Sequence, residues 1–497
     1  MVAVKCWIRS DLSNGFRRQG HSGLQGHVVG AVEYKQARLM KHVSRLICFA
    51  AGLATAGGAL AAISAEEAKQ LGTTLTVFGA EKAGNKEGTI PPYTGEGVKP
   101  PASYDPKEPG RRPDPFANEK PLFSITAQNA AQYADKLDGM QEMFKKYPNF
   151  RMDIYPSHRT MTYPKWVLDN TLKNATACKG VDNDLKLEGC YGGLPFPIPK
   201  TGAQVMWMKL TSFEAQAWQG NSQSWVVAND GSSAMSAADD VWQQSWYYDP
   251  SITTPASPKV TFWAARVDDT APARKVGQKL VLIDPLDTLG VGRRAYQYVP
   301  GQRRVKLAPD LAYDTPAPTA GGVMTMDDAR VFLGAIDRYD WKLLGKKEKY
   351  IMYNNFKMTD HTTCKTDVIQ TKSFANPDCV RWELHRVWAV EGKLKAGFRH
   401  IYARRLFYWD EDAFGAGMAE NYDGGGKLYR IGTAVTYPYW ANEGAGMSFD
   451  NNIVYDLQTG NWVNNGTTAN PGTGWYTMKP ASALLYSPEA LAGEGIR

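Results

Sequence analysis

Metal-binding chemistry has few candidate residues in this sequence. Residues 62–497 contain four histidines, namely His158, His361, His385 and His400. They form neither an H-E-x-x-H motif nor a closely spaced pair, so we predict no metal site. The stretch 182–186 (DNDLK) begins like a calcium loop, but Lys186 occupies a ligand position and Leu187 the position that needs glycine.

Carboxylates offer a second kind of chemistry. Asp410, Glu411 and Asp412 follow a predicted strand, and Asp423 precedes three glycines. Paired carboxylates can act as general acid and base, but solvated strand ends explain these residues better. The stretch 446–450 (GMSFD) lacks the closing glycine of a nucleophile elbow, and 426–428 (GKL) does not complete a phosphate loop. We therefore predict that the protein is not an enzyme and needs no cofactor.

The net charge of +7 belongs almost wholly to the first 61 residues. These hold eight Lys or Arg against two Asp or Glu, so residues 62–497 carry a net charge of +1. Without that leader nothing favours a nucleic-acid partner. Arginine pairs remain at 303–304 and 404–405; they could meet phosphate headgroups or an acidic partner, but outward strand faces explain them better.

The leader itself is typical of an exported protein. Residues 40–45 form a short basic segment opening on Met40, residues 46–58 are apolar, and 59–61 (ALA) fit a small-x-small cleavage site. We predict a signal peptide over 40–61, and interpret residues 1–39 as a mis-called N-terminal extension. The expected location is the periplasm, either free or peripheral to the outer membrane.

Cysteine usage agrees with export. The four cysteines after residue 61 fall into two pairs that are close in sequence, Cys178 with Cys190 and Cys364 with Cys379. An even number in an exported chain indicates disulfides, each worth up to ~3 kcal/mol in the loop-entropy model. The alternative, a zinc site, lacks any C-x-x-C pair.

Two regions differ in the elements that would position these residues. Residues 62–200 read as a helical and extended N-terminal region: a capping box at 64–67, an extended Gly/Pro arm over 84–120, and helices over 126–146 and 164–174. Residues 201–490 read as consecutive strands with one helix over 325–333. The predicted strands cover 205–210, 225–227, 260–263, 280–283, 295–299, 304–307, 382–390, 398–409, 428–436 and 453–457. This order favours an α+β, mostly β domain with a large antiparallel sheet.

Several blocks of the sequence resemble one known family. The most distinctive are 79–85 (GAEKAGN), 192–199 (GGLPFPIP), 298–305 (YVPGQRRV), 337–348 (DRYDWKLLGKKE) and 397–402 (GFRHIY), followed by 407–412 (FYWDED). Together they resemble the family numbered 1329 among domains of unknown function, over about residues 62–485. Its members are often described as outer-membrane lipoprotein-sorting proteins. The resemblance implies a LolA/LolB-like fold: an incomplete, strongly curved antiparallel barrel with helices packed on or in it. It implies no catalytic residues.

The aromatic strand faces can then be read in two ways, as ordinary core or as the wall of an apolar cavity. On the second interpretation we predict a periplasmic carrier or chaperone for lipid, lipoprotein acyl chains or another hydrophobic ligand. The predicted cavity-lining residues are Trp207, Phe262, Trp263, Tyr296, Tyr298, Trp388 and Tyr408. The alternative is an accessory or sensor protein of an envelope transporter. The resemblance suggests as partner an exporter of the resistance-nodulation-division type or an outer-membrane protein.

Overall fold

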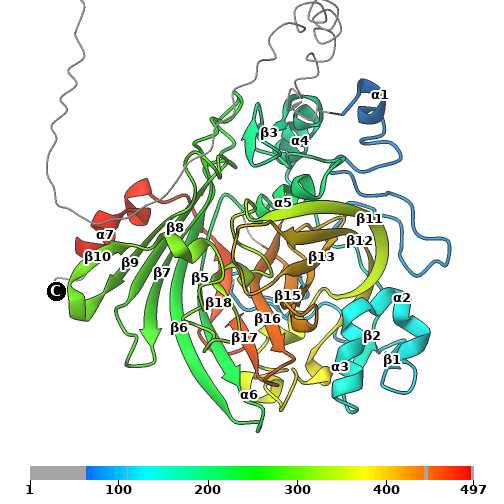
Figure 1. Cartoon of the computed structure of the whole chain (residues 1–497). Helices are drawn as coiled ribbons and strands as arrows, with labels where there is room; N and C mark the ends of the chain where they lie inside the picture. The colour runs from blue at the N-terminus through cyan, green and yellow to red at the C-terminus, as the bar shows by residue number, and fades with distance from the viewer. Residues whose placement is uncertain (1–62, 109, 441–445, 494–497) are drawn as a thin grey trace, which may run out of the picture. The chain divides into compact units, whose positions relative to one another are not determined.

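Figure 1 shows the computed structural model of the chain, which describes residues 63–108, 110–440 and 446–493. The predicted extension (1–39) and the predicted signal peptide (40–61) lie outside the described residues.

The chain before residue 211 forms short elements joined by long coils. The helices are α1 (Ala65–Ala68), α2 (Ala134–Leu137), α3 (Gln141–Lys146), α4 (Lys165–Ala177) and α5 (Gly202–Leu210); the strands are β1 (Phe123–Ile125), β2 (Met152–Ile154), β3 (Lys179–Val181) and β4 (Lys186–Glu188). The capping box of α1 is present: Ser64 Oγ accepts from Glu67 N–H, and the Glu67 carboxylate accepts from Ser64 N–H. The arm at 84–120 contains no helix or strand at any position that the structure describes.

The rest of the chain builds one sheet. Its strands are β5 (Ala217–Val227), β6 (Ser233–Gln244), β7 (Thr261–Ala271), β8 (Lys279–Pro285), β9 (Arg294–Val299), β10 (Arg304–Leu307), β11 (Tyr339–Met352), β12 (Trp382–Leu394), β13 (Arg404–Asp410), β14 (Gly417–Tyr422), β15 (Leu428–Pro438), β16 (Met447–Asp456), β17 (Trp462–Thr467) and β18 (Gly474–Thr477). Short helices and 3-10 turns connect them: η3 (Pro300–Gln302), η4 (Pro309–Ala312), η5 (Met326–Asp328), η6 (Phe356–Thr359), α6 (Thr366–Ile369), η7 (Pro377–Cys379), η8 (Ala483–Tyr486) and α7 (Pro488–Gly493).

The strand order is β1-β2-β12-β13-β14-β15-β16-β17-β5-β6-β7-β8-β9-β10, with β11 beside β12 and β18 beside β5. Neighbours are antiparallel except for a single parallel pairing of β2 with β12. The end strands β1 and β10 do not pair with each other in the described ranges, so the sheet is open. The predicted class, mostly β with one large antiparallel sheet, is confirmed.

Bulges give this sheet its bends. Register shifts interrupt the ladders at several places, among them Thr261/Trp263 and Ala238/Asp239 in the β5–β8 part. An extra residue on one strand bends it and increases the local twist. Figure 1 shows β5 to β10 (green) as long curved ribbons beside one another.

Three predicted elements were wrong. The predicted strand 205–210 is part of α5, which starts at the N-cap Thr201, whose Oγ1 accepts from Gln204 N–H. Because every residue of α5 is buried, no polar face marks it as a helix. The predicted helix 126–146 breaks into α2, α3 and 3-10 turns at Asp138, whose φ is 46°. The predicted helix 325–333 is only the single turn η5, because Arg330 and Val331 adopt φ values of 55° and 69°.

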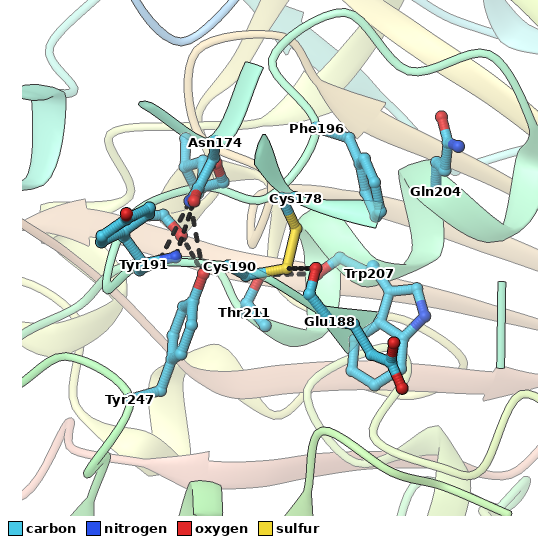
Figure 2. The surroundings of a disulfide bond; sticks show 12 residues. Asn174, Cys178, Glu188, Cys190, Tyr191, Phe196, Gln204, Trp207, Thr211 and Tyr247 are labelled. Atoms are coloured by element: carbon cyan, nitrogen blue, oxygen red, sulfur yellow. Dashed lines mark hydrogen bonds between the residues drawn. A yellow bond between two sulfur atoms is a disulfide. The ribbon is translucent and has the colours of Figure 1, made fainter. Parts of the chain in front are cut away.

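The two cysteine pairs are joined as disulfides, Cys178–Cys190 and Cys364–Cys379. Figure 2 shows the first, which links the end of α4 to the loop after β4. Asn174 fixes the same loop, since its Nδ2 donates to the Tyr191 carbonyl (3.0 Å) and its Oδ1 accepts from Tyr191 N–H (2.7 Å). This part of the chain is thus held by covalent and hydrogen bonds rather than by regular secondary structure.

The C-terminal residues cover one face of β7–β9. Ala264, Val281 and Tyr298 pack there with Tyr486 and Leu491. Figure 1 shows α7 (red) beside β10. The opposite face of the same strands is therefore the one available for a cavity.

Candidate functional site

A cavity of about 170 Å³ lies against one face of β5–β8. Residues 308–338, which connect β10 to β11, lie over it; we call them the covering segment. They contribute Ala317, Pro318, Thr319, Met324, Met326, Ala329, Arg330 and Leu333 to its lining. The cavity thus lies between a sheet and an irregular segment.

Strand alternation explains why this lining is apolar. Trp263, Ala265 and Val267 of β7 face the cavity, as do Leu280 and Leu282 of β8, whereas Ala264 lies between them on the face under α7. An apolar cavity of about 150 Å³ can hold benzene, while pockets for larger ligands measure about 300–1,000 Å³. The cavity therefore fits a small apolar group, and a longer chain must extend beyond it or displace the covering segment.

Two aspartates form a polar end of this cavity. Asp239 of β6 and Asp269 of β7 lie directly opposite each other in the ladder, and both line the cavity. Asp239 is 6% exposed, and its Oδ1 has no hydrogen-bond partner among the described residues. Burial, together with the neighbouring carboxylate of Asp269, raises the pKa of Asp239 well above its ordinary value.

The other polar end is a hydrogen-bond network around Asp450. Its carboxylate accepts from Trp218 Nε1 (2.9 Å) and Gln243 Nε2 (2.6 Å). Gln243 Oε1 accepts in turn from Trp263 Nε1 at 2.7 Å. Arg330 of the covering segment forms an ion pair with Glu214 and lies 3.6 Å from Asp450. This end therefore holds the covering segment to the sheet.

The covering segment is anchored unequally along its length. Around Asp327 and Asp328 the anchors are charged: Arg405 donates to both carboxylates at 2.6 and 2.8 Å. Burial would raise the pKa of Asp327, but Arg405 and His400 hold it below its ordinary value. Around residues 317–322 the anchors are single hydrogen bonds that involve no carboxylate. Lys275 Nζ donates to the Pro318 carbonyl (2.8 Å), Arg430 to the Gly322 carbonyl (2.8 Å), and Thr319 Oγ1 donates to Asn465 Oδ1 (3.1 Å). The 317–322 part is the less firmly held one.

The seven residues predicted to line a cavity do not lie together. Trp263 lines the cavity under the covering segment. Trp207 and Phe262 pack edge to face at a centroid distance of 5.7 Å, in the core beside α5. Tyr298, with Tyr296 packed against the same cluster, lies on the face under α7. Trp388 lies on β12 under Lys346 Nζ, which is 4.9 Å from the ring centroid. The role of all seven in ligand binding stays a prediction.

Tyr408 lines a different hollow, a groove of about 650 Å³. Its walls carry charges, including Asp138, Glu142, Lys146 and Glu420. The buried Lys349 Nζ lies 4.0 Å from the Tyr408 ring centroid and donates to Asp138 at 3.0 Å. Because its walls carry charged groups, this groove is unsuited to an apolar ligand.

The acidic group at 410–412 is not solvated, contrary to our expectation. Asp410, Glu411 and Asp412 are at most 2% exposed. Arg159 donates to Asp412 at 2.6 and 2.7 Å. His385 bridges Asp410 (2.9 Å) and Glu383 (3.1 Å), in contact with the Tyr353 ring. The carboxylates are thus partners in a buried ion network.

The ionisation of His385 reports how strong this network is. Burial alone would lower the pKa of His385, but Asp410 and Glu383 raise it to about 9. Arg405, which we expected on an outward strand face, is also fully buried, between Asp327 and Asp328. These groups stabilise the fold rather than face a substrate.

Two features are absent from the described residues, a metal-binding cluster and a membrane-spanning helix. Among residues 63–108, 110–440 and 446–493, no cluster of three or more His, Cys, Asp or Glu side chains could hold a metal ion. No helix in the same ranges has the length and apolar character needed to cross a membrane.

The sequence did not single out the aspartate pair or the covering segment. A signal for the pair exists, because two acidic doublets, 239–240 and 268–269, lie on consecutive strands of a hairpin. Alternation then puts one member of each doublet on the cavity face. The covering segment has no such signal, since its irregular backbone lacks periodicity.

The fold and cavity define a class of protein: an open antiparallel sheet with an apolar cavity between its strands and an irregular covering segment. The chain belongs to the DUF1329 family, a family of proteins of unknown function, whose model matches residues 124–492. The family membership expected from the sequence blocks is thereby confirmed. An uncharacterised protein of Pseudomonas aeruginosa is 38% identical over 443 residues, covering 88% of this chain and 95% of that protein.

Solved structures show more distant similarity. A DUF1329 family protein from Desulfovibrio piger has 12% identity and a TM-score of 0.38, covering 58% of this chain and 95% of that one. A putative outer membrane lipoprotein-sorting protein domain from Vibrio parahaemolyticus has 12% identity and a TM-score of 0.39, over 58% and 97%. A LolA superfamily protein from Nitrosomonas europaea has 13% identity and a TM-score of 0.34, over 59% and 100%.

Proposed function

We propose that this protein is a periplasmic carrier that binds a hydrophobic ligand in the cavity under the covering segment and delivers it to an envelope partner. The observation that carries the proposal is the apolar cavity between β5–β8 and residues 308–338. The two disulfides support an oxidising compartment. Lipid and lipoprotein acyl chains are the ligands that the family resemblance suggests.

Carrying such a ligand requires no catalytic group. Burying an acyl chain gives about 0.8 kcal/mol per methylene, and this energy is available to any chain that reaches the cavity. For delivery to a partner, binding of the acyl chain must be reversible. A segment that opens at its less firmly held part, residues 317–322, would provide the exit.

Delivery needs a receiving protein. An envelope exporter of the resistance-nodulation-division type, or an outer-membrane protein, would be a suitable receiving protein. The transferred ligand would leave by opening of the covering segment rather than by any change in covalent structure.

The direct test is to purify the protein from its native envelope, extract it with organic solvent and analyse the extract by mass spectrometry. We expect co-purifying amphiphiles, and we expect the empty protein to bind a fluorescent fatty acid. Ala265→Met places a longer side chain on the cavity wall and should weaken this binding by about tenfold or more. Ala234→Met, the same change at an exposed position of β6, is the matched control.

Extraction that yields no amphiphile, together with no binding of the fluorescent fatty acid, would exclude the carrier proposal. Equal binding by the Ala265→Met and Ala234→Met variants would show that the ligand occupies another site.

A further inference from the structure

Asp239 carries a buried acceptor that faces the cavity and lacks a partner. Its Oδ1 has no hydrogen bond within the described ranges, although the residue is 6% exposed. A buried acceptor without a donor is unfavourable. An explanation is therefore needed for why an aspartate is placed here.

The sheet brings a second carboxylate to the same place. Asp269 lies directly across the ladder from Asp239, where like charges repel each other. The register shift between Ala238 and Asp239 occurs at this pair. Bulges of this kind re-aim side chains next to functional sites.

The basic groups nearby do not neutralise the pair. Arg330 pairs with Glu214 and Asp450, and Lys279 is 3.5 Å from Asp268. Lys275 lines the cavity and donates to the Pro318 carbonyl. The charge of Lys275 acts on Asp239, but its ammonium group donates its hydrogen bond to that carbonyl rather than to the pair.

We propose that the cavity selects a single-chain amphiphile with a cationic amine head, whose ammonium group binds Asp239 and Asp269 while its alkyl chain lies along the apolar wall. This inference rests on the proposed carrier function and narrows its ligand class.

The geometry supports this orientation of the ligand. In the next cross-strand row, two residues further along the strands, Val241 faces the cavity opposite Val267. The alkyl chain of a ligand whose head group lies at the aspartates therefore meets the apolar wall within about 7 Å. An ammonium group supplies the donor that Asp239 Oδ1 lacks, and it takes the place of the proton that the pair must otherwise share. A carboxylate or phosphate head would face two aspartates and is excluded by repulsion.

Three probes of equal chain length test the proposal: octylamine, octanol and octanoate at pH 7, each displacing the neutral dye N-phenyl-1-naphthylamine from the full-length protein. We expect octylamine to bind about tenfold more tightly than octanol, and octanoate more weakly than both. Asp239→Asn should reduce the preference for octylamine over octanol to below about threefold, with octanol binding unchanged.

Asp240→Asn is the matched control. Asp240 is adjacent on β6, but alternation points it to the opposite face, where it contacts Asn221. This variant should keep the full preference for octylamine. If Asp239→Asn does not fold, as judged by circular dichroism, Asp269→Asn replaces it, since it changes the other carboxylate of the pair.

Two results would overturn the inference while leaving the carrier function in place. The first is octanol or octanoate binding as tightly as octylamine. The second is a preference for octylamine that survives in both aspartate variants. If none of the probes binds and the dye also fails to bind, the carrier proposal and the inference fail together.

Discussion

Around β12–β14 the sheet buries ions in matched pairs, whereas against β5–β8 it leaves a cavity with an unsatisfied acceptor. In the first region Arg159 reaches Asp412 and Glu411, and His385 joins Glu383 to Asp410. In the second region Asp239 Oδ1 has no partner in the part of the chain that the structure describes. Both regions belong to one continuous sheet.

This difference between the two regions separates buried charges that stabilise the fold from buried charges that could bind a ligand. A buried ion pair with both partners present fixes the local structure, and removing one partner is strongly destabilising. A buried polar atom that faces empty space has no such structural purpose. The residues with the most obvious catalytic chemistry, His385 and the 410–412 carboxylates, therefore belong to the structural region.

The largest effect should come from breaking an ion pair in the β12–β14 region. Arg159→Met leaves Asp412 buried without its guanidinium partner, so we expect a loss of about 3–5 kcal/mol in the free energy of unfolding. Urea denaturation measures it. Arg304→Met, at an exposed position of β10, should change stability by less than about 0.5 kcal/mol. Similar losses in the two variants would contradict the assigned role of the network.

The pH dependence of stability should report the same region. The pKa of His385 is raised from 6.5 to about 9 in the folded protein, so its contribution of about 3 kcal/mol is full below pH 6.5 and is lost as the pH rises through 9. His385→Gln should remove this decline between pH 6.5 and 9. Unfolding curves at a series of pH values compare the two proteins, and parallel profiles would rule out the role given to His385.

Adding volume should distinguish the two regions directly. Ala419→Met in β14 enters a fully packed core and should reduce stability by about 1–3 kcal/mol. Ala265→Met extends into the cavity and should change stability by less than about 1 kcal/mol. Thermal or urea denaturation of both variants tests this, and an equal loss would mean that the cavity is not available space.

The smallest effect should come from the less firmly held part of the covering segment. Ser236→Ala removes the hydroxyl that donates to the Thr319 carbonyl and should reduce stability by about 1 kcal/mol or less. Hydrogen exchange should become faster at residues 317–322 and stay unchanged at 327–330. Uniform exchange along the segment would contradict the difference in anchoring.

Sequence patterns predicted the sheet well and the site poorly, for definable reasons. The apolar run 280–283 and the alternating stretch 382–390 both predict strands that the structure contains. The fully buried α5 carries no polar face, so its apolar residues were taken for a strand. The acidity of 410–412 suggested exposure, because their partner Arg159 is about 250 positions earlier in the chain. A contact of that separation leaves no local pattern.

The place where β5 meets β17 and β18 has a consequence for how the chain folds. Ser224 bonds to Asn465 across this join, 241 positions away, and the join also supplies Asn465, Gly466 and Trp475 to the cavity wall. During synthesis β5–β10 are complete long before β17 exists. The cavity is therefore finished only by the last tenth or so of the chain. Contacts between such distant residues make folding slow, and a chain that ends before residue 462 would have a sheet with an open gap in place of a binding site.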